Sequence, residues 1–223
     1  METMTPSSTI RLAIVEDDDL FRDLLRLALA SLPGVSVIAD FADPDRALDE
    51  IPALAPDVLL LDIDLGRGRN GIQLGKALRS ALPKVGVLLF SNHRDPAFLG
   101  AIPSDQLSGW SYLLKTSVRD VATLERAIRG SAMGYVILDP RLAAASPSRE
   151  AQQVGLTERQ YSLIQLLAQG YSNKAIAQQL FLSEKTVENQ LGTLYRQLGI
   201  DTADTGTHAR VQATLQFLRW LSD

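Results

Sequence analysis

The stretch of sequence that decides the fold is IRLAIVEDDD, residues 10–19, in which a short apolar run leads straight into four acidic residues. Apart from one arginine the run has no polar alternation, which is typical of a parallel strand covered on both faces. Similar runs recur along the first half of the chain, each followed by turn residues and a stretch with helical periodicity. The strands expected from these runs are residues 10–15, 35–39, 58–61, 85–90 and 112–114.

Helices are expected between and after these strands. They should begin near Asp19, Pro44, Gly71, Pro96 and Ser117, with Pro103 cutting the fourth one short, because proline cannot continue a helix. Five units of this strand-helix kind predict a doubly wound, flavodoxin-like α/β domain with a five-stranded parallel sheet over residues 10–130. Residues 1–9 are expected to be a flexible N-terminus.

The second half of the chain has a different pattern. Residues 131–154 are interpreted as a linker, because strand and helix signals weaken among Gly, Pro, Ala and Ser. Residues 155–223 predict an all-α domain of four short helices. Its helix boundaries are indicated by a capping box at Thr157 and Gln160, by N-cap serines at 172 and 183, and by glycines at 170 and 199.

Composition excludes several classes of protein. The chain has 223 residues, 46% of them hydrophobic and 22% charged, as in globular proteins of one or two domains. Cysteine is absent, which excludes disulfides, thiolate zinc sites and cysteine nucleophiles. The start of the chain lacks a signal-peptide pattern, and no apolar run approaches the roughly 18 residues that a membrane helix needs. A cytoplasmic protein without membrane contact is therefore expected.

Acidic side chains follow the first and third expected strands. Glu16 and Asp17 come directly after the first strand, and Asp62 closes the third. Because the carboxyl ends of parallel strands meet at one edge of a sheet, these carboxylates should converge. Crowded carboxylates repel one another unless a hard cation neutralises them, so the sequence predicts a Mg²⁺ site.

Two further side chains stand at the ends of later strands, Ser91 after the fourth and Lys115 after the fifth. A carboxylate nucleophile, a metal, an ammonium group and a hydroxyl are together what phosphoryl transfer to an aspartate requires. Each residue alone is more often a helix cap or a solvated surface group. Their joint placement at strand ends favours the functional interpretation.

These motifs resemble a known family. AIVEDDDLFR at residues 13–22, PDVLLLD at 56–62, the Ser91 strand end and YLLK at 112–115 resemble the receiver domain of two-component response regulators. The resemblance implies that Asp62 is the phosphorylated residue. It implies that Glu16 and Asp17 are the family's acidic pair, with Asp17 the more direct Mg²⁺ ligand, and that the backbone carbonyl of Asp64 completes the coordination.

The same resemblance assigns the remaining site residues. Lys115 would contact the phosphoryl group, Ser91 would move to bond it, and Tyr112 would be the aromatic switch, although a half-buried strand residue is the alternative for Tyr112. Two departures concern the loop after Asp62. Gly66 stands where the family usually has proline, and residues 65–70 form a loop one residue longer than usual.

The segment 183–198 has the pattern of an amphipathic helix. Val187, Leu191, Leu194 and Leu198 form an apolar stripe, and Lys185, Asn189, Gly192 and Arg196 cluster on the opposite side. Such a face can enter a DNA major groove, with Asn189 bonding base edges, Lys185 and Arg196 reaching phosphates, and Gly192 allowing close approach. An ordinary solvated helix face is the alternative for this segment taken alone.

The surrounding motifs favour DNA binding. LTERQ at 156–160, QGYSNKAIA at 169–177 and LSEKTVEN at 182–189 resemble the LuxR/NarL-type helix-turn-helix. The resemblance implies a supporting helix at 171–180 and a recognition helix at 183–198. The DNA-binding residues expected from it are Ser172, Asn173, Lys174, Lys185, Thr186, Glu188, Asn189, Gly192 and Arg196. Glu188 and Gln190 are departures, since the family often has a basic residue and a histidine there.

Charge suggests how DNA binding would be controlled. Residues 151–223 hold six basic and six acidic residues and so have no net charge, while the whole chain has −4. Non-specific affinity for DNA comes largely from counterion release, so a monomer should bind weakly and a homodimer on paired half-sites more tightly. For the last helix, expected at about 205–221, Val211, Leu215, Leu218 and Trp220 should be buried in the core or in a dimer interface.

The leading hypothesis is a transcription regulator that receives a phosphoryl group on Asp62 from a sensor histidine kinase, dimerises and binds promoter DNA. It would not be an enzyme beyond its own phosphoryl transfer and dephosphorylation. One alternative is a pseudo-receiver that binds DNA constitutively or on another signal. Another takes Asp62 and Asp64 as the DxD motif of a haloacid-dehalogenase-type phosphatase, but that motif should follow the first strand, and here it follows the third.

Overall fold

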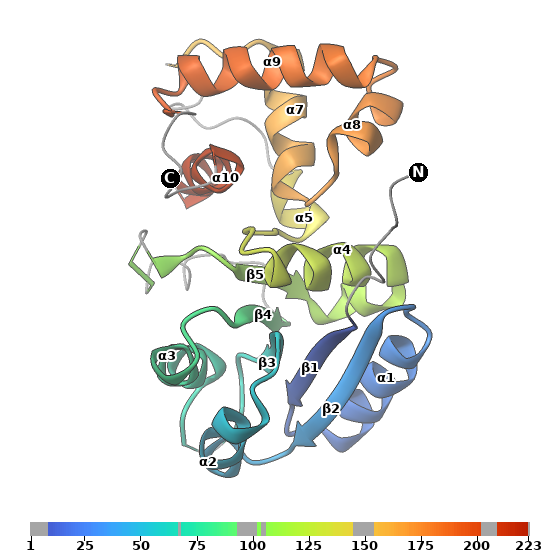
Figure 1. Cartoon of the computed structure of the whole chain (residues 1–223), viewed down its shortest axis with the longest axis vertical. Coiled ribbons are helices and arrows are strands. Elements are labelled where there is room, and N and C mark those ends of the chain that lie inside the picture. The colour runs from blue at the N-terminus through green and yellow to red at the C-terminus, as the bar shows by residue number, and fades with distance from the viewer. Residues whose placement is uncertain are drawn as a thin grey trace, which may run out of the picture. The chain divides into compact units, whose positions relative to one another are not determined.

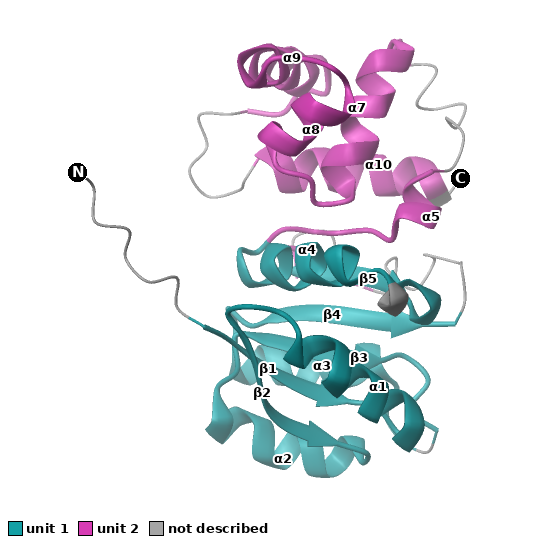
Figure 2. Cartoon of the chain, turned by 90° about the vertical axis from the view of Figure 1, so that its right-hand side faces the viewer, with its two compact units in different colours: residues 1–93, 109–134 teal, residues 94–108, 135–223 magenta. Residues whose placement is uncertain are grey.

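The computed structural model describes residues 9–66, 68–92, 102–103, 106–144, 154–201 and 209–222. The chain divides into two compact units (Figure 2). One consists of residues 1–93 and 109–134, and the other of residues 94–108 and 135–223. The first contains a sheet with covering helices, and the second is built from helices.

The first unit contains a five-stranded sheet in which all strands run parallel, in the order β2-β1-β3-β4-β5 (Figure 1). β3 and β4 are buried along their whole length, which explains why their sequences are continuous apolar runs. The expected strands all occur, with shifts of one or two residues at some ends. They are β1 Ile10–Val15, β2 Val35–Phe41, β3 Val58–Asp62, β4 Gly86–Ser91 and β5 Trp110–Leu114.

Helices cover both faces of this sheet, as a doubly wound fold requires. α1 and α4 lie over one face, and α2 and α3, which contact each other, lie over the other (Figure 1). In the first three helices the side chains of Asp18, Asp43 and Asn70 accept hydrogen bonds from backbone amides of the first turn. The predicted starts of these three are confirmed. The bounds are α1 Asp19–Ala30, α2 Pro44–Leu54, α3 Gly71–Ala81 and α4 Val121–Ala132.

The last helix of the first unit begins later than the sequence indicates. Lys115–Arg119 forms a short 3-10 helix, η3, and α4 starts at Val121. The expected start at Ser117 is wrong because Asp120 caps α4 instead, accepting from the Ala122 and Thr123 amides and from the Thr123 hydroxyl. The helix expected near Pro96 lies outside the described residues.

Within its described residues, the second unit contains the four predicted helices and a short additional one. Its helices are α5 Pro140–Ala143, α7 Glu158–Ala168, α8 Asn173–Gln179, α9 Glu184–Gln197 and α10 Ala209–Ser222. The capping box at Thr157 and Gln160 is present. α10 packs against α7, where the rings of Phe217 and Tyr161 meet edge to face with centroids 5.7 Å apart. On α10, Val211, Leu218 and Trp220 are buried, whereas Leu215 is only partly so.

Part of the stretch expected to be a linker has defined structure. α4 continues to Ala132, and residues 136–138 are buried. The Leu138 amide donates to the Ala168 carbonyl of α7 at 2.8 Å, and Gln165 Nε2 donates to the Ala143 carbonyl at 2.9 Å. Residues 135–144 are therefore part of the second unit. Among the described residues, no helix combines the length and apolarity needed to span a membrane.

Removal of the α4 cap by Asp120→Ala should destabilise the first unit by about 1 kcal/mol, while Asp120→Asn, which keeps an acceptor, should cost less. The hydrogen bond from Thr123 lowers the pKa of Asp120 below its ordinary 3.8. The charged form is thus favoured by folding, and its contribution is present at neutral pH and is lost as the pH falls below that value. Urea unfolding of wild type and variants at neutral pH and at a pH below 3.8 tests this expectation. A difference between wild type and Asp120→Ala that does not shrink in acid would contradict it.

Candidate functional site

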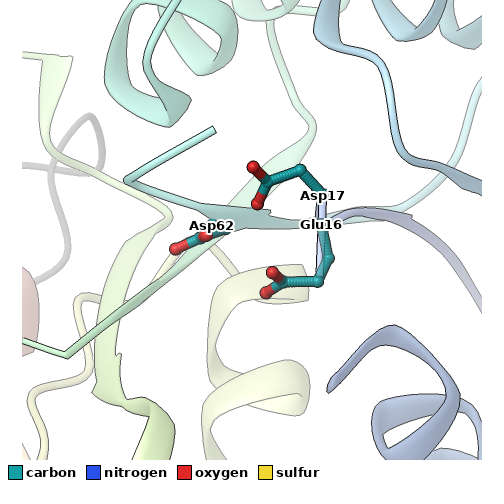
Figure 3. Close-up of side chains that lie close together, drawn as sticks. All are labelled: Glu16, Asp17 and Asp62. Atoms are coloured by element: carbon teal, nitrogen blue, oxygen red, sulfur yellow. The ribbon is translucent and has the colours of Figure 1, made fainter. Parts of the chain in front are cut away.

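Three carboxylates gather at the carboxyl edge of the sheet (Figure 3). Glu16 and Asp17 follow β1, Asp62 ends β3, and one oxygen of each lies within 4.8 Å of the others. The strand ends meet because β1 and β3 are neighbours, with Val15 paired to Leu61. Glu16 and Asp62 are buried, and Asp17 is exposed.

The ammonium group of Lys115 joins two of these carboxylates. Lys115 directly follows β5, and its Nζ donates to Asp62 Oδ2 and to Glu16 Oε1, both at 3.0 Å. Nζ also lies 2.9 Å from Glu16 Oε2, but not in a direction that makes a hydrogen bond. Glu16 Oε2 is thus a buried oxygen that makes no hydrogen bond within the described part of the chain.

Burial affects the pKa values of both Glu16 and Lys115. Burial raises the pKa of Glu16 to about 7, the charge of Asp62 adds to the increase, and Lys115 opposes it. Burial by itself would lower the pKa of Lys115, but its hydrogen bonds to Glu16 and Asp62 outweigh this effect and raise it. Lys115 therefore stays charged at neutral pH, and a further cation beside Glu16 would stabilise the ionised carboxylate.

The acidic cluster fits Mg²⁺. This ion prefers carboxylate and carbonyl oxygens and usually binds to one or two carboxylates while keeping several waters. Asp17 supplies an exposed oxygen and Asp62 a buried one, and the unbonded Oε2 of Glu16 lies beside them. The donor set is therefore of the right chemistry for a hard divalent cation.

Two residues to which the sequence analysis gives no role shape the site. The ring of Phe21, on α1, lies 4.6 Å from Lys115 Nζ and so adds a cation-π contact to the two carboxylates. Gly71 begins α3 so close to β3 that a Cβ there would lie 2.0 Å from the Asp62 carbonyl oxygen. Neither contact is indicated by sequence spacing, because both depend on how separate elements pack.

Gly66 explains the departure in the loop after Asp62. Its φ is +60°, whereas the proline ring fixes φ near −65°. A Cβ at Gly66 would also lie 2.8 Å from Asp17 Oδ2. Gly66 therefore has a backbone conformation that proline cannot adopt, and a side chain there would require the Asp17 carboxylate to shift.

The other predicted site residues also lie at this edge of the sheet. The Asp64 amide donates to Asp62 Oδ1 at 3.2 Å. Ser91 is the last residue of β4, is buried, and pairs in register with Leu114 of β5. Tyr112 is fully buried in β5, rather than half-buried.

In the second unit, α8 and α9 form a helix-turn-helix. The two helices contact each other and are joined by residues 180–183, with Phe181 in a left-handed conformation at φ 56°. Val187, Leu191 and Leu194 are buried as predicted, and Leu198, just beyond the helix, is partly exposed. The opposite face carries the predicted DNA-contacting side chains. Lys185, Glu188, Asn189 and Arg196 are exposed, and Thr186 and Gly192 are partly so.

Some of these side chains contact one another. Lys185 Nζ forms an ion pair with Glu188 Oε2 at 3.2 Å, so the departure at Glu188 neutralises a neighbouring cation. Arg196 donates to the Thr193 hydroxyl. On α8, Ser172 is the N-cap and accepts from the Ala175 amide at 3.2 Å; Lys174 is exposed and Asn173 partly exposed.

Comparison with known proteins covers both units. Residues 12–129 match the response regulator receiver domain, and residues 154–214 match the bacterial regulatory proteins of the luxR family. The DNA-binding transcriptional activator DevR/DosR of Mycobacterium tuberculosis is 33% identical, over 92% of this chain and 94% of its own. The nitrate/nitrite response regulator protein NarP of Escherichia coli is 33% identical, over 97% and 98%.

A solved structure supports the fold. The RcsB response regulator of Salmonella typhimurium superposes with a TM-score of 0.53 at 20% identity, over 95% of this chain and 99% of that one. Sheet, acidic edge and helix-turn-helix together define a receiver domain followed by a DNA-binding domain. The chain belongs to the response regulators with a LuxR-type DNA-binding domain, and the two relatives named above are a DNA-binding transcriptional activator and a nitrate/nitrite response regulator.

Gly66→Ala should weaken Mg²⁺ binding by about tenfold, because the added Cβ displaces the Asp17 carboxylate. Gly68→Ala is the matched control: Gly68 also has a positive φ, of 93°, but the nearest atom to its Cβ position is Asp45 Oδ2 at 4.0 Å. Isothermal titration with MgCl₂ measures both variants. Equal losses would mean that backbone strain in the loop, and not the contact with Asp17, sets the affinity.

Proposed function

We propose that this response regulator controls transcription and is switched by phosphorylation of Asp62. The observation that carries the proposal is the position of Lys115 Nζ, 3.0 Å from both Asp62 and Glu16 and beside the acidic cluster. An ammonium group held there is placed to neutralise the oxygens of a phosphoryl group arriving at Asp62. The partner proposed as phosphoryl donor is a sensor histidine kinase, in keeping with the receiver family.

The transfer moves a phosphoryl group from a histidine nitrogen to a carboxylate oxygen. A lone pair of Asp62 forms the O–P bond while the P–N bond breaks, and its electron pair returns to the histidine. Mg²⁺, held by Asp17, Asp62 and the Asp64 carbonyl with Glu16 close by, would neutralise charge on the phosphoryl oxygens. Lys115 stays charged because its carboxylate partners raise its pKa. It could therefore contact the phosphoryl group by giving up its hydrogen bond to Asp62 Oδ2 and donating to a phosphoryl oxygen instead.

The proposed response uses Ser91 and Tyr112. Ser91 is buried at the end of the neighbouring strand β4, from which its hydroxyl would bond a phosphoryl oxygen. Tyr112 lies in β5 three residues before Lys115, so its side chain would rearrange with the residues that contact the phosphoryl group. The phosphorylated state then shifts the population of receiver conformations.

The proposed output is promoter binding by a homodimer. α9 would enter the major groove with Lys185, Thr186, Glu188, Asn189, Gly192 and Arg196, and Ser172, Asn173 and Lys174 would lie along the backbone. The ion pair between Lys185 and Glu188 reduces the cationic character of this face. Two copies are needed because one neutral domain gains little from counterion release.

A cytoplasmic location follows from the proposed DNA partner. A phosphorylation-independent regulator is not favoured, because Asp62, Lys115 and the acidic pair are all assembled at one edge of the sheet.

The switch is tested with beryllofluoride and MgCl₂, which mimic a phosphoryl group. Wild type should gain the adduct in native mass spectra and shift towards a dimer, whereas Asp62→Ala should do neither. A wild type that stays unmodified would rule out the acceptor role of Asp62. An adduct without a change in oligomeric state would separate phosphorylation from dimerisation.

Asn189→Ala should reduce affinity for a duplex selected by the wild type from a random library by about 1 to 3 kcal/mol, with a smaller effect on random DNA. Asn189 is exposed on α9 and bears an amide suited to base edges. Fluorescence anisotropy on both duplexes measures the difference. Equal losses on the two would argue against base recognition by this residue.

A further inference from the structure

Arg210, at the start of α10, is surrounded by three parts of the second unit. Its Nη1 and Nη2 both donate to the carbonyl oxygen of Tyr171, at 2.9 and 2.8 Å. Its guanidinium also lies over the ring of Tyr135, 5.6 Å from the centroid. The phenol of Tyr195, on α9, interacts with it electrostatically.

Arg210 is partly buried. Burial lowers its pKa from the usual value, and the interactions with Tyr195 and Tyr135 oppose this. Burial likewise raises the pKa of Tyr195, and the charge of Arg210 opposes the increase. A cation in such a place is held by a carbonyl and by aromatic rings, and the paired donors of arginine suit this arrangement better than a lysine would.

The contacts of Arg210 lead to the residues proposed to bind DNA. Tyr171 directly precedes Ser172, the N-cap of α8, so fixing its carbonyl fixes the segment that presents Ser172, Asn173 and Lys174. Tyr195 lies on α9, one turn beyond Leu191 and on the helix that carries Asn189. Arg210 therefore binds the residue that precedes the N-cap of α8 and interacts electrostatically with Tyr195 of α9, and it is not among the residues expected to touch DNA.

Tyr135 brings in a segment from outside the helix-turn-helix. It is the first residue after the receiver unit, which ends at Gly134. The residues that follow it are fastened to α7 by the Leu138 amide and the Ala143 carbonyl. Ile137 packs on Gly170, where an added Cβ would lie 2.8 Å from its Cδ1. Tyr135 is therefore the first residue of the segment that packs in the second unit, and the Arg210 guanidinium lies over its ring.

We propose that Arg210 is a positioning residue for DNA binding: covered by Tyr135, it holds the Tyr171 carbonyl and thereby sets the placement of α8 against α9. Tyr135 to Ala143 is then a required part of the DNA-binding unit. The inference rests on the proposed DNA-binding function.

The first test compares Arg210→Gln with Arg219→Gln in the full chain. Arg219 lies on the same helix and is exposed, so both variants lose one positive charge from α10. The probe is a fluorescein-labelled random-sequence duplex, titrated at several salt concentrations. We expect Arg210→Gln to lose affinity on the order of tenfold, with a smaller salt dependence because backbone contacts near α8 are lost, and Arg219→Gln to change by less than about twofold.

Two further measurements separate positioning from loss of fold. Amide hydrogen exchange of residues 172–176 should accelerate in Arg210→Lys while the thermal midpoint of the domain stays above the assay temperature, because lysine keeps the charge but not the paired donors. Tyr135→Phe, which keeps a ring over Arg210, should bind as wild type does, and Tyr135→Leu should lose about threefold.

Equal affinities of Arg210→Gln and Arg219→Gln would overturn the inference while leaving the proposed function intact. If Tyr135→Leu binds DNA as tightly as the wild type, Tyr135 has no part in positioning Arg210. If Arg210→Lys unfolds below the assay temperature, the Tyr135 pair decides the outcome. Failure of the wild type to bind any duplex would instead overturn the proposed function itself.

Discussion

The receiver unit depends on the ion pairs that the ammonium group of Lys115 forms with Glu16 and Asp62. The ammonium group stands between two buried carboxylates that come from different strands, Glu16 after β1 and Asp62 at the end of β3. Without a cation these groups would repel each other in a place that water reaches poorly. Lys115, which follows β5, thus reaches the ends of β1 and β3 and offsets the repulsion between the two buried carboxylates. The same residue is then already in position for chemistry at Asp62.

The second unit has little net charge with which to attract DNA. α9 has exposed polar groups, but residues 151–223 have no net charge and Lys185 of α9 is paired with Glu188. Attraction to DNA at long range is therefore weak, and the geometry of the reading face matters more than the bulk charge. Contacts that hold α8 and α9 in place from behind gain importance in such a domain.

Much of this architecture could be predicted from the sequence, because local chemistry and global topology agree. Apolar runs predicted the buried strands, and helix starts were correctly expected near Asp19, Pro44 and Gly71 and at the capping box of Thr157. Glu16, Asp17, Asp62 and Lys115 could be grouped because parallel strands end at one edge. Ser117 and Asp120 both have capping side chains, and only the contacts of Asp120 with Thr123 decide between them. The cover given by Phe21 and the path of the loop at Gly66 depend on packing between elements, which periodicity does not encode.

The all-parallel sheet has a consequence for the order in which the two units form. Parallel neighbours cannot be joined by a tight hairpin, so every pairing in β2-β1-β3-β4-β5 waits for a long crossover connection. Helices α8 and α9 instead pack mainly on each other, and they are neighbours in the sequence. Chains with local contacts fold faster than chains with distant ones. In a refolding chain the helix-turn-helix should therefore assemble before the sheet that carries Asp62, so that for a short time the DNA-binding unit exists without a folded receiver.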